Sequence, residues 1–193
     1  FFLAWTTTPW TLPSNTALCV GPKITYVKVR SFNPYTGLPV TLILAKNLLA
    51  THFDPKNAEL PLEDYAQGDK KIPYRVLAEY SGTQLEGVNY EQLINWVQPK
   101  GDAFRVITGD FVTTEDGTGI VHIAPTFGAD DDRVAKQHGI SPLIVDDKDG
   151  KRQPMVDRNG RFFLVENMDN AFVSEYVNLE TYSEFAGRFV KNA

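Results

Sequence analysis

Short runs of β-branched residues, separated by turn-forming residues, constrain the fold of this chain most. Residues 24–30 and 40–46 are rich in Val, Ile and Thr and flank the turn-forming stretch 33–37, so they predict a β-hairpin. Further strand character is expected at residues 74–80, 104–108, 110–114, 119–124, 143–145 and 161–165. Residues 104–124 in particular predict a small meander with a turn at residues 115–117. Strands should therefore outnumber helices.

Helices are predicted at only a few places. Residues 130–138 begin with three aspartates, carry Val134 and Ala135 on one side and end at His138 and Gly139, which is the pattern of a short capped helix. Residues 47–53 predict a second short helix, and residues 55–69 predict a polar loop.

Length and composition favour one elaborated domain. The 193 residues, 42% of them hydrophobic, suffice for one sizeable core, and no repeat or long linker divides residues 1–193. The first residue, Phe1, is not an initiator Met, so we expect a domain excised from a longer protein. Cys19 is the only cysteine, and no apolar run approaches the roughly 20 residues of a membrane span. A soluble protein of the cytoplasm is the expectation.

The charge of the chain limits its partners. A net charge of −5 and a pI of about 5.2 argue against a protein that grips a long stretch of nucleic-acid backbone, because neutralising many phosphates requires a basic face. A nucleic acid that contacts the chain through only one of its ends remains compatible with this charge.

Two segments carry more chemistry than connecting loops require. Residues 5–15 read Trp-Thr-Thr-Thr-Pro-Trp-Thr-Leu-Pro-Ser-Asn, and threonines before a proline favour an extended chain. Such a segment can line a polar pocket, bind a ribose or hold a water, or it is simply an edge strand that enters a loop. Asn15 is most often a turn or cap residue.

The second segment, residues 117–132, is an apolar run that contains His122 and leads into Asp130, Asp131 and Asp132. One aspartate suffices to cap a helix, and such a cap contributes about 0.5–2 kcal/mol. At least one of the other two carboxylates is then available to bind a cation. His122 is either an ordinary core or rim histidine or a pocket residue. Together the two segments predict a pocket for a positively charged group.

Several other chemistries lack their motifs. No Gly-x-Ser-x-Gly elbow accompanies His122, which argues against covalent catalysis. Residues 147–150 imitate a calcium loop, but Val145 and Val156 stand where ligands are needed, so they predict a hairpin turn. Residues 117–119 lack the remaining features of a phosphate loop. Metal-dependent hydrolysis by His122 and the aspartates is an alternative without a usual ligand set.

The two segments resemble the editing motifs of the isoleucyl-tRNA synthetase family. Residues 5–15 are similar to its threonine-rich motif, and residues 117–131 are similar to its second editing motif. Leucyl and valyl relatives usually carry Arg-Pro-Asp-Thr or Arg-Pro-Glu-Thr in the first motif, so Pro-Trp-Thr-Leu-Pro favours the isoleucyl type. Residues 87–93 fit more loosely. The aminoacylation signatures, of His-Ile-Gly-His and Lys-Met-Ser-Lys-Ser type, are absent from the 193 residues.

The resemblance implies a β-rich α+β fold: a compact, barrel-like editing domain with a few short helices. It also implies hydrolysis of the ester of valine wrongly attached to isoleucine tRNA, with hydrolysis of the valyl adenylate left open. A buried methylene contributes only about 0.8 kcal/mol, and discrimination of isoleucine from valine by this family is the standard illustration of why a second sieve is needed. A non-catalytic aminoacyl- or nucleotide-binding insert, or the editing domain of a valyl or leucyl enzyme, is the alternative.

The resemblance also implies roles for individual residues. Asp131 would hold the α-ammonium of the aminoacyl group, and His122 would admit valine while crowding out isoleucine. The segment Thr6, Thr7 and Thr8 would contact the ester, the terminal ribose or the attacking water. The remaining substrate contacts would come from Trp5, Trp10, Asn15, Phe127, Gly128 and Ala129.

Within that set, stacking on the terminal adenine is expected of Trp5 and Trp10, and stabilisation of an oxyanion by backbone amides is expected at residues 127–129. The implied partners are the single-stranded 3′ CCA end of isoleucine tRNA and the rest of the synthetase. We expect a monomer without a metal, a cofactor or a membrane contact.

Overall fold

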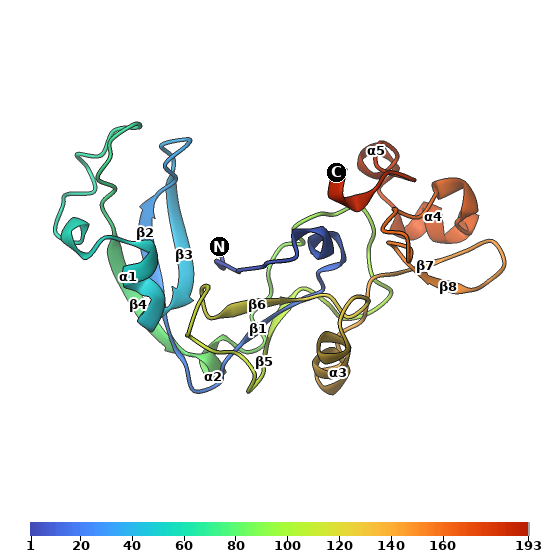
Figure 1. The fold of residues 1–193 in the computed structure, drawn as a ribbon, viewed down its shortest axis with the longest axis horizontal. Helices are drawn as coiled ribbons and strands as arrows, with labels where there is room; N and C mark the ends of the chain where they lie inside the picture. Colours follow the sequence, from blue (N-terminus) through green and yellow to red (C-terminus); the bar gives the residue numbers. More distant parts are fainter. Residues whose placement is uncertain (193) are drawn as a thin grey trace. The chain divides into compact units, whose positions relative to one another are not determined.

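The computed structural model describes residues 1–192. Its strands are β1 (Ala17–Val20), β2 (Thr25–Phe32), β3 (Pro39–Ala45), β4 (Arg75–Ser81), β5 (Arg105–Thr108), β6 (Ile120–Ile123), β7 (Ile144–Asp146) and β8 (Arg152–Pro154). Its α-helices are α1 (Leu49–His52), α2 (Gly82–Leu85), α3 (Ala129–Gln137), α4 (Asn170–Tyr176) and α5 (Leu179–Tyr182) (Figure 1). Its 3₁₀ helices are η1 (Pro9–Ser14), η2 (Lys46–Leu48), η3 (Pro55–Asn57), η4 (Val165–Asn167) and η5 (Val190–Asn192).

The chain divides into two compact units. Unit 1 comprises residues 1–6, 18–88 and 106–121, and unit 2 comprises residues 7–17, 89–105 and 122–193. Each unit is therefore built from three separate stretches of sequence. The organisation of residues 1–193 as a single domain stays a prediction.

Unit 1 contains the predicted hairpin. Strands β2 and β3 pair antiparallel, and β4 pairs with the other edge of β2. Asn33 begins the connecting turn, where its Oδ1 accepts the backbone N–H groups of Tyr35 and Thr36 at 2.9 and 3.2 Å. Gly37 follows with a φ of +69°, which glycine adopts without steric cost. The hairpin, the strand at residues 74–80 and the short helix at residues 47–53 are confirmed.

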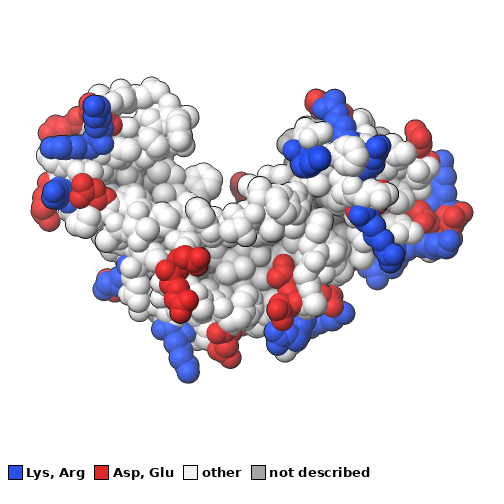
Figure 2. Space-filling view, viewed as in Figure 1, with Lys and Arg blue, Asp and Glu red and all other residues white. Residues whose placement is uncertain are grey.

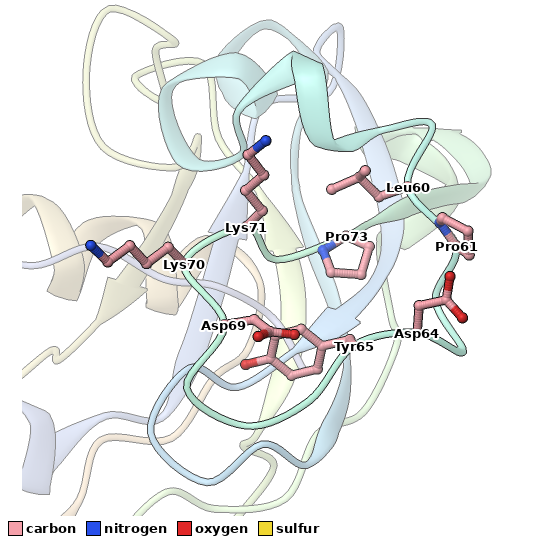
Figure 3. Close-up of a pocket in the computed structure, with 8 residues that line it drawn as sticks. All are labelled: Leu60, Pro61, Asp64, Tyr65, Asp69, Lys70, Lys71 and Pro73. Carbon is pink, nitrogen blue, oxygen red and sulfur yellow. The ribbon is translucent and has the colours of Figure 1, made fainter.

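A pocket of about 360 Å³ lies in the loop region of unit 1 (Figure 3). Its lining residues are Leu60, Pro61, Asp64, Tyr65, Asp69, Lys70, Lys71 and Pro73. The Tyr65 ring stacks on Phe32 with 4.4 Å between ring centroids. In Figure 3 the side chains of Lys70 and Lys71 point in different directions, so they do not form a joint clamp for an anion. None of the predicted site residues lines this pocket.

The predicted meander at residues 104–124 is wrong. Strands β5 and β6 do not pair with each other, because β1 lies between them in the order β5-β1-β6. Residues 110–114 form turns and bends rather than a strand. Strand β1 was not predicted from the sequence. All four of its residues are buried, and a strand covered on both faces is a continuous apolar run without alternation.

Unit 2 has its own hydrophobic core. The buried cluster consists of Val97, Leu143, Val145, Met155, Val156, Phe162, Met168, Phe172 and Tyr182. Trp96 covers this cluster, with its ring stacked on Phe185 at 4.3 Å. Asp169 caps the start of helix α4, where its carboxylate accepts the N–H of Phe172 at 2.9 Å. Neither α4 nor α5 was predicted from the sequence.

Two further predictions in unit 2 have opposite outcomes. The hairpin turn at residues 147–150 is confirmed between β7 and β8, and Asp147 Oδ1 accepts the N–H groups of Asp149 and Lys151 at 2.9 and 2.8 Å. The strand predicted at residues 161–165 is wrong, because this stretch makes only isolated bridges at Arg161 and Phe162 before η4 begins.

The mixed α+β, strand-rich class is confirmed, with a few short helices. The strands of residues 1–192 form two three-stranded sheets and one two-stranded sheet, and none of these sheets closes into a barrel. The barrel-like arrangement is therefore not confirmed. Among residues 1–192, no helix combines the length and the hydrophobicity needed to span a bilayer.

Candidate functional site

The threonine-rich segment changes conformation at Pro9. Residues up to Thr8 lie outside any helix, and the 3₁₀ helix η1 begins at Pro9, because a proline ring presets the φ angle of a first helical position. Thr7 lies in a bend, and Thr8 has a φ of −125° and a ψ of 64°, outside the extended region. The expectation of an extended chain is therefore wrong at Thr7 and Thr8. Helix η1 buries Thr11, Pro13 and Ser14 and leaves Trp10 exposed.

Thr11 connects this segment to His122. Its Oγ1 lies 2.8 Å from the carbonyl oxygen of Thr8, to which it donates, and 3.0 Å from Nε2 of His122. Both Thr11 and His122 are only 7% exposed. Because 111 residues separate them in the chain, only the folded structure brings them together, and Thr11 was not among the predicted site residues.

His122 lies on β6 and is buried in a way that favours its neutral form. Burial lowers the pKa of His122, and the nearby carboxylate of Asp131 opposes this effect only in part. The second ring nitrogen, Nδ1, is buried and has no hydrogen-bond partner among residues 1–192. A neutral imidazole with one occupied nitrogen suits a pocket wall better than a cationic group.

Asp131 is the aspartate that the fold turns inward. Its Oδ2 accepts the backbone N–H of Ala124 at 2.8 Å, and its Oδ1 makes no hydrogen bond among residues 1–192. Burial raises the pKa of Asp131, whereas the N–H of Ala124 and the charge of His122 lower it. The half-buried carboxylate therefore keeps one oxygen open to a cation.

The two neighbouring aspartates are surface residues of α3. Asp130 pairs with Arg133 at 2.8 Å, and Asp132 pairs with Lys136 at 2.6 Å. Their side chains are 82% and 40% exposed, so these pairs contribute little, about 0–1 kcal/mol each. Of the three aspartates, Asp131 is the one whose charge acts on the pKa of His122.

Asn15 is buried, and its amide is engaged within the protein. Its Nδ2 donates to the carbonyl oxygens of Ala17 at 2.8 Å and Ile123 at 3.4 Å. Its Oδ1 accepts the hydroxyl of Tyr90 at 2.6 Å, and burial raises the pKa of Tyr90. These hydrogen bonds join the residue that follows η1 to Ile123 at the end of β6. The sequence contained no signal for Tyr90.

The loop before α3 offers backbone donors at two of the three predicted positions. The N–H of Phe127 donates to the carbonyl oxygen of Ala124 at 2.9 Å, so it is not available to a ligand. Gly128 is the N-cap of α3 and Ala129 is its first residue, with no side-chain cap. First-turn N–H groups have no partner within the helix, so the amides at residues 128 and 129 are candidate donors for a ligand. The Phe127 side chain is 41% exposed.

The remaining predicted residues fall into both units. Thr7 and Thr8 are exposed residues of unit 2, whereas Trp5 and Thr6 belong to unit 1. Within unit 1, the N–H of Trp5 donates to Ile120 at 3.3 Å, and its ring packs on Gly117. Participation of Trp5 and Thr6 in the site stays a prediction.

The donor set of the site suits an organic cation. Among residues 1–192, no group of three or more His, Cys, Asp or Glu side chains is placed to hold a metal ion. The site instead offers one open carboxylate oxygen, a neutral imidazole and two amides without a partner in the helix. Such groups can recognise an ammonium and an adjacent carbonyl.

Known proteins resemble this chain along its whole length. Isoleucine–tRNA ligase of Bacteroides fragilis (strain YCH46) is 64% identical over 193 residues, which are 100% of this chain and 17% of that protein. The enzyme of Porphyromonas gingivalis is 61% identical over 195 residues, again covering 100% of this chain and 17% of the relative. The chain belongs to the isoleucine–tRNA ligase family. It spans about a sixth of the length of these curated relatives, and no family model matches it.

The fold is similar to a solved editing domain. A crystal structure of the P. falciparum cytosolic leucyl-tRNA synthetase editing domain, containing deletions of insertions 1 and 3, superposes with a TM-score of 0.50 and 14% sequence identity. The match covers 78% of this chain and 55% of that chain. At this identity, the similarity to the leucyl domain concerns the fold alone.

Proposed function

We propose that this chain is the editing domain of an isoleucine–tRNA ligase and hydrolyses the ester that joins valine to isoleucine tRNA. Asp131 carries the proposal: a half-buried carboxylate keeps Oδ1 open beside a buried, neutral His122. An aminoacyl ester presents an ammonium, a small side chain and a carbonyl, and the site offers a complement to each of them. The 64% identity to an isoleucine–tRNA ligase over all 193 residues supports the same function.

In the proposed mechanism, Asp131 Oδ1 binds the α-ammonium, and this charge-assisted hydrogen bond gains strength in a partly dry site. The oxygen of water attacks the ester carbonyl carbon, and the amides at residues 128 and 129 stabilise the oxyanion. The bond to the ribose oxygen then breaks, releasing valine and a free 3′ end. The free hydroxyl of the terminal adenosine assists the proton transfer.

His122 acts in this mechanism as a wall rather than a base. Its Nε2 is engaged with Thr11 at 3.0 Å, and burial disfavours the charged imidazolium. The buried ring would leave room for valine and crowd isoleucine. In a pocket that only binds the side chain, burial of the extra methylene of isoleucine would contribute about 0.8 kcal/mol. The hydroxyls of Thr7 and Thr8 contact the ester, the ribose or the water, and Trp10, 45% exposed, stacks on the adenine.

The proposed partner is the 3′ CCA end of the tRNA. Figure 2 shows Lys and Arg side chains interspersed with Asp and Glu over the region of α4, β7 and β8, and the net charge is −5. Such a surface suits contact with a single-stranded tip, with the duplex held by the rest of the ligase. We further propose a monomer in the cytoplasm that needs no cofactor for this step.

A deacylation assay tests the proposal. Val-tRNA and Ile-tRNA, both made with isoleucine tRNA, are incubated with this chain and with a full-length isoleucine–tRNA ligase that carries it. We expect hydrolysis of the valyl ester and protection of the isoleucyl ester. A full-length protein that leaves the valyl ester intact would falsify the proposal, whereas binding without turnover would favour a non-catalytic insert.

Replacing His122 tests the sieve. His122→Ala enlarges the amino-acid subsite, so the preference for the valyl over the isoleucyl ester should fall by about fourfold or more, the equivalent of one methylene. Thr181→Val, an exposed change in unit 2, serves as the control. If the preference survived His122→Ala unchanged, another group would set the size limit.

A further inference from the structure

The hydrogen bonds of Thr11 determine which way its single hydroxyl proton points. Thr11 Oγ1 lies 2.8 Å from the carbonyl oxygen of Thr8, which cannot donate. Two oxygens at that distance without a proton between them would repel each other, so the Thr11 hydroxyl donates to Thr8. The same oxygen then has only lone pairs to offer to its other two neighbours, the Thr8 hydroxyl at 3.4 Å and Nε2 of His122.

His122 must therefore donate to Thr11. Its Nε2 lies 3.0 Å from Thr11 Oγ1, within the usual range for an N–H···O bond. In a neutral imidazole only one nitrogen carries a proton. If Nε2 carries that proton, Nδ1 is an unprotonated acceptor.

The surroundings of Nδ1 agree with this tautomer. Nδ1 is buried without a partner among residues 1–192, in a side chain of a residue that is only 7% exposed. A buried N–H without an acceptor costs about 1–3 kcal/mol. In the Nε2–H tautomer, the group left without a partner at Nδ1 is a lone pair and not a proton.

We infer that Thr11 is a positioning residue that holds His122 in its Nε2–H tautomer and so keeps the buried Nδ1 an unprotonated acceptor in the wall of the site. That this wall belongs to an aminoacyl-ester site rests on the proposed function. Thr11 is itself only 7% exposed, and its effect passes through the imidazole.

Nitrogen NMR of the histidine rings measures the tautomer directly. In the ¹⁵N-labelled chain near neutral pH, the ring signals of His122 are assigned by their loss in His122→Asn. We expect a single Nε2–H tautomer with a slowly exchanging Hε2 proton. A ring protonated at Nδ1, or a fast-exchanging mixture of both tautomers, would overturn the inference without any variant of Thr11.

Two variants separate positioning from packing. Thr11→Val removes the hydroxyl at nearly constant volume, and Hε2 should exchange with water about tenfold faster or more, the equivalent of one hydrogen bond. Thr11→Ser keeps the hydroxyl and should retain slow exchange. The exposed Thr181→Val is the matched control and should leave the ring signals unchanged. Unchanged Hε2 exchange in a folded Thr11→Val would contradict the inference.

Hydrolysis gives a second, separable readout. In Thr11→Val, kcat for the valyl ester should fall about tenfold with KM changed by less than about twofold, and Thr11→Ser should restore it. If the chain hydrolyses no ester but the tautomer behaves as expected, only the proposed function fails. If hydrolysis proceeds while the wild-type ring is protonated at Nδ1, only the role of Thr11 fails.

Discussion

The threonine-rich segment and the first turn of α3 each carry a row of similar side chains, and in each row the fold turns one member inward. In the first row, Thr11 is buried, Thr6 is half-buried, and Thr7 and Thr8 are exposed. In the second row, Asp131 is half-buried while Asp130 and Asp132 form surface ion pairs. Chemical type alone does not distinguish the members of a row, because burial assigns their roles.

The two inward residues differ in what they leave open. The hydroxyl of Thr11 is hydrogen-bonded to Thr8 and His122, so Thr11 organises the site and has no group left for a ligand. One carboxylate oxygen of Asp131 accepts the N–H of Ala124, and the other oxygen is available to a ligand. The comparison teaches that an internally satisfied polar residue positions the site, whereas a partly satisfied one recognises the substrate.

The largest expected effect concerns the open carboxylate. Asp131→Ala should weaken binding of a non-hydrolysable valyl-adenosine analogue by about 100-fold, because a charge-assisted hydrogen bond to the ammonium is lost. Calorimetric titration measures the change, with an isoleucyl analogue as a weaker ligand. Asp132→Ala, which removes only a surface pair with Lys136, should stay within about twofold. Equal losses in both variants would erase the distinction between the aspartates.

The next effect concerns the hydroxyl of Thr11, which is hydrogen-bonded within the protein. Its loss should lower the free energy of unfolding of the protein without ligand. Thr11→Val strands the Nε2–H of His122, so the free energy of unfolding should fall by about 1–2 kcal/mol. Urea unfolding at unchanged m-value measures it. Thr7→Val, at an exposed position, should change stability by less than about 0.5 kcal/mol. A Thr11→Val protein as stable as Thr7→Val would show that burial did not matter here.

The smallest effect is the pH dependence of stability. Burial lowers the pKa of His122 in the folded chain. The unfolded chain therefore takes up a proton at His122 at a higher pH than the folded chain does, near the ordinary histidine pKa of about 6.5. Stability should therefore decrease as pH falls below about 6.5. Asp131, whose charge acts on the pKa of His122, has a raised pKa and so contributes in the opposite direction at lower pH.

Urea unfolding at several pH values between about 7 and 5 checks this sign. His122→Asn cannot titrate, so its stability should decline less over that interval than that of the wild type. Parallel curves for the two proteins would mean that His122 titrates alike in the folded and unfolded states. Asp131→Asn, measured beside it, isolates the opposing contribution.

Local features of the fold followed from the sequence. The hairpin of β2 and β3, the turn at residues 147–150 and the helix α3 each depend on neighbours a few positions apart: alternation, an Asx turn, an acidic first turn and Gly139 after the helix. Pairing between distant strands did not follow. Strand β1 separates β5 from β6, and a fully buried strand carries no alternation by which to recognise it.

The candidate site divides in the same way. The amino-acid sequence already contains the chemical groups of the site, namely the threonines before Pro9, His122 and three aspartates, and their likeness to editing motifs. Three contacts depend on the tertiary structure: Thr11 meets His122 across 111 residues, Tyr90 donates to Asn15, and Asp131 accepts the N–H of Ala124. The physical reason is that burial and hydrogen-bond partners depend on which segments pack together, and packing between distant segments leaves no periodic signal in either of them.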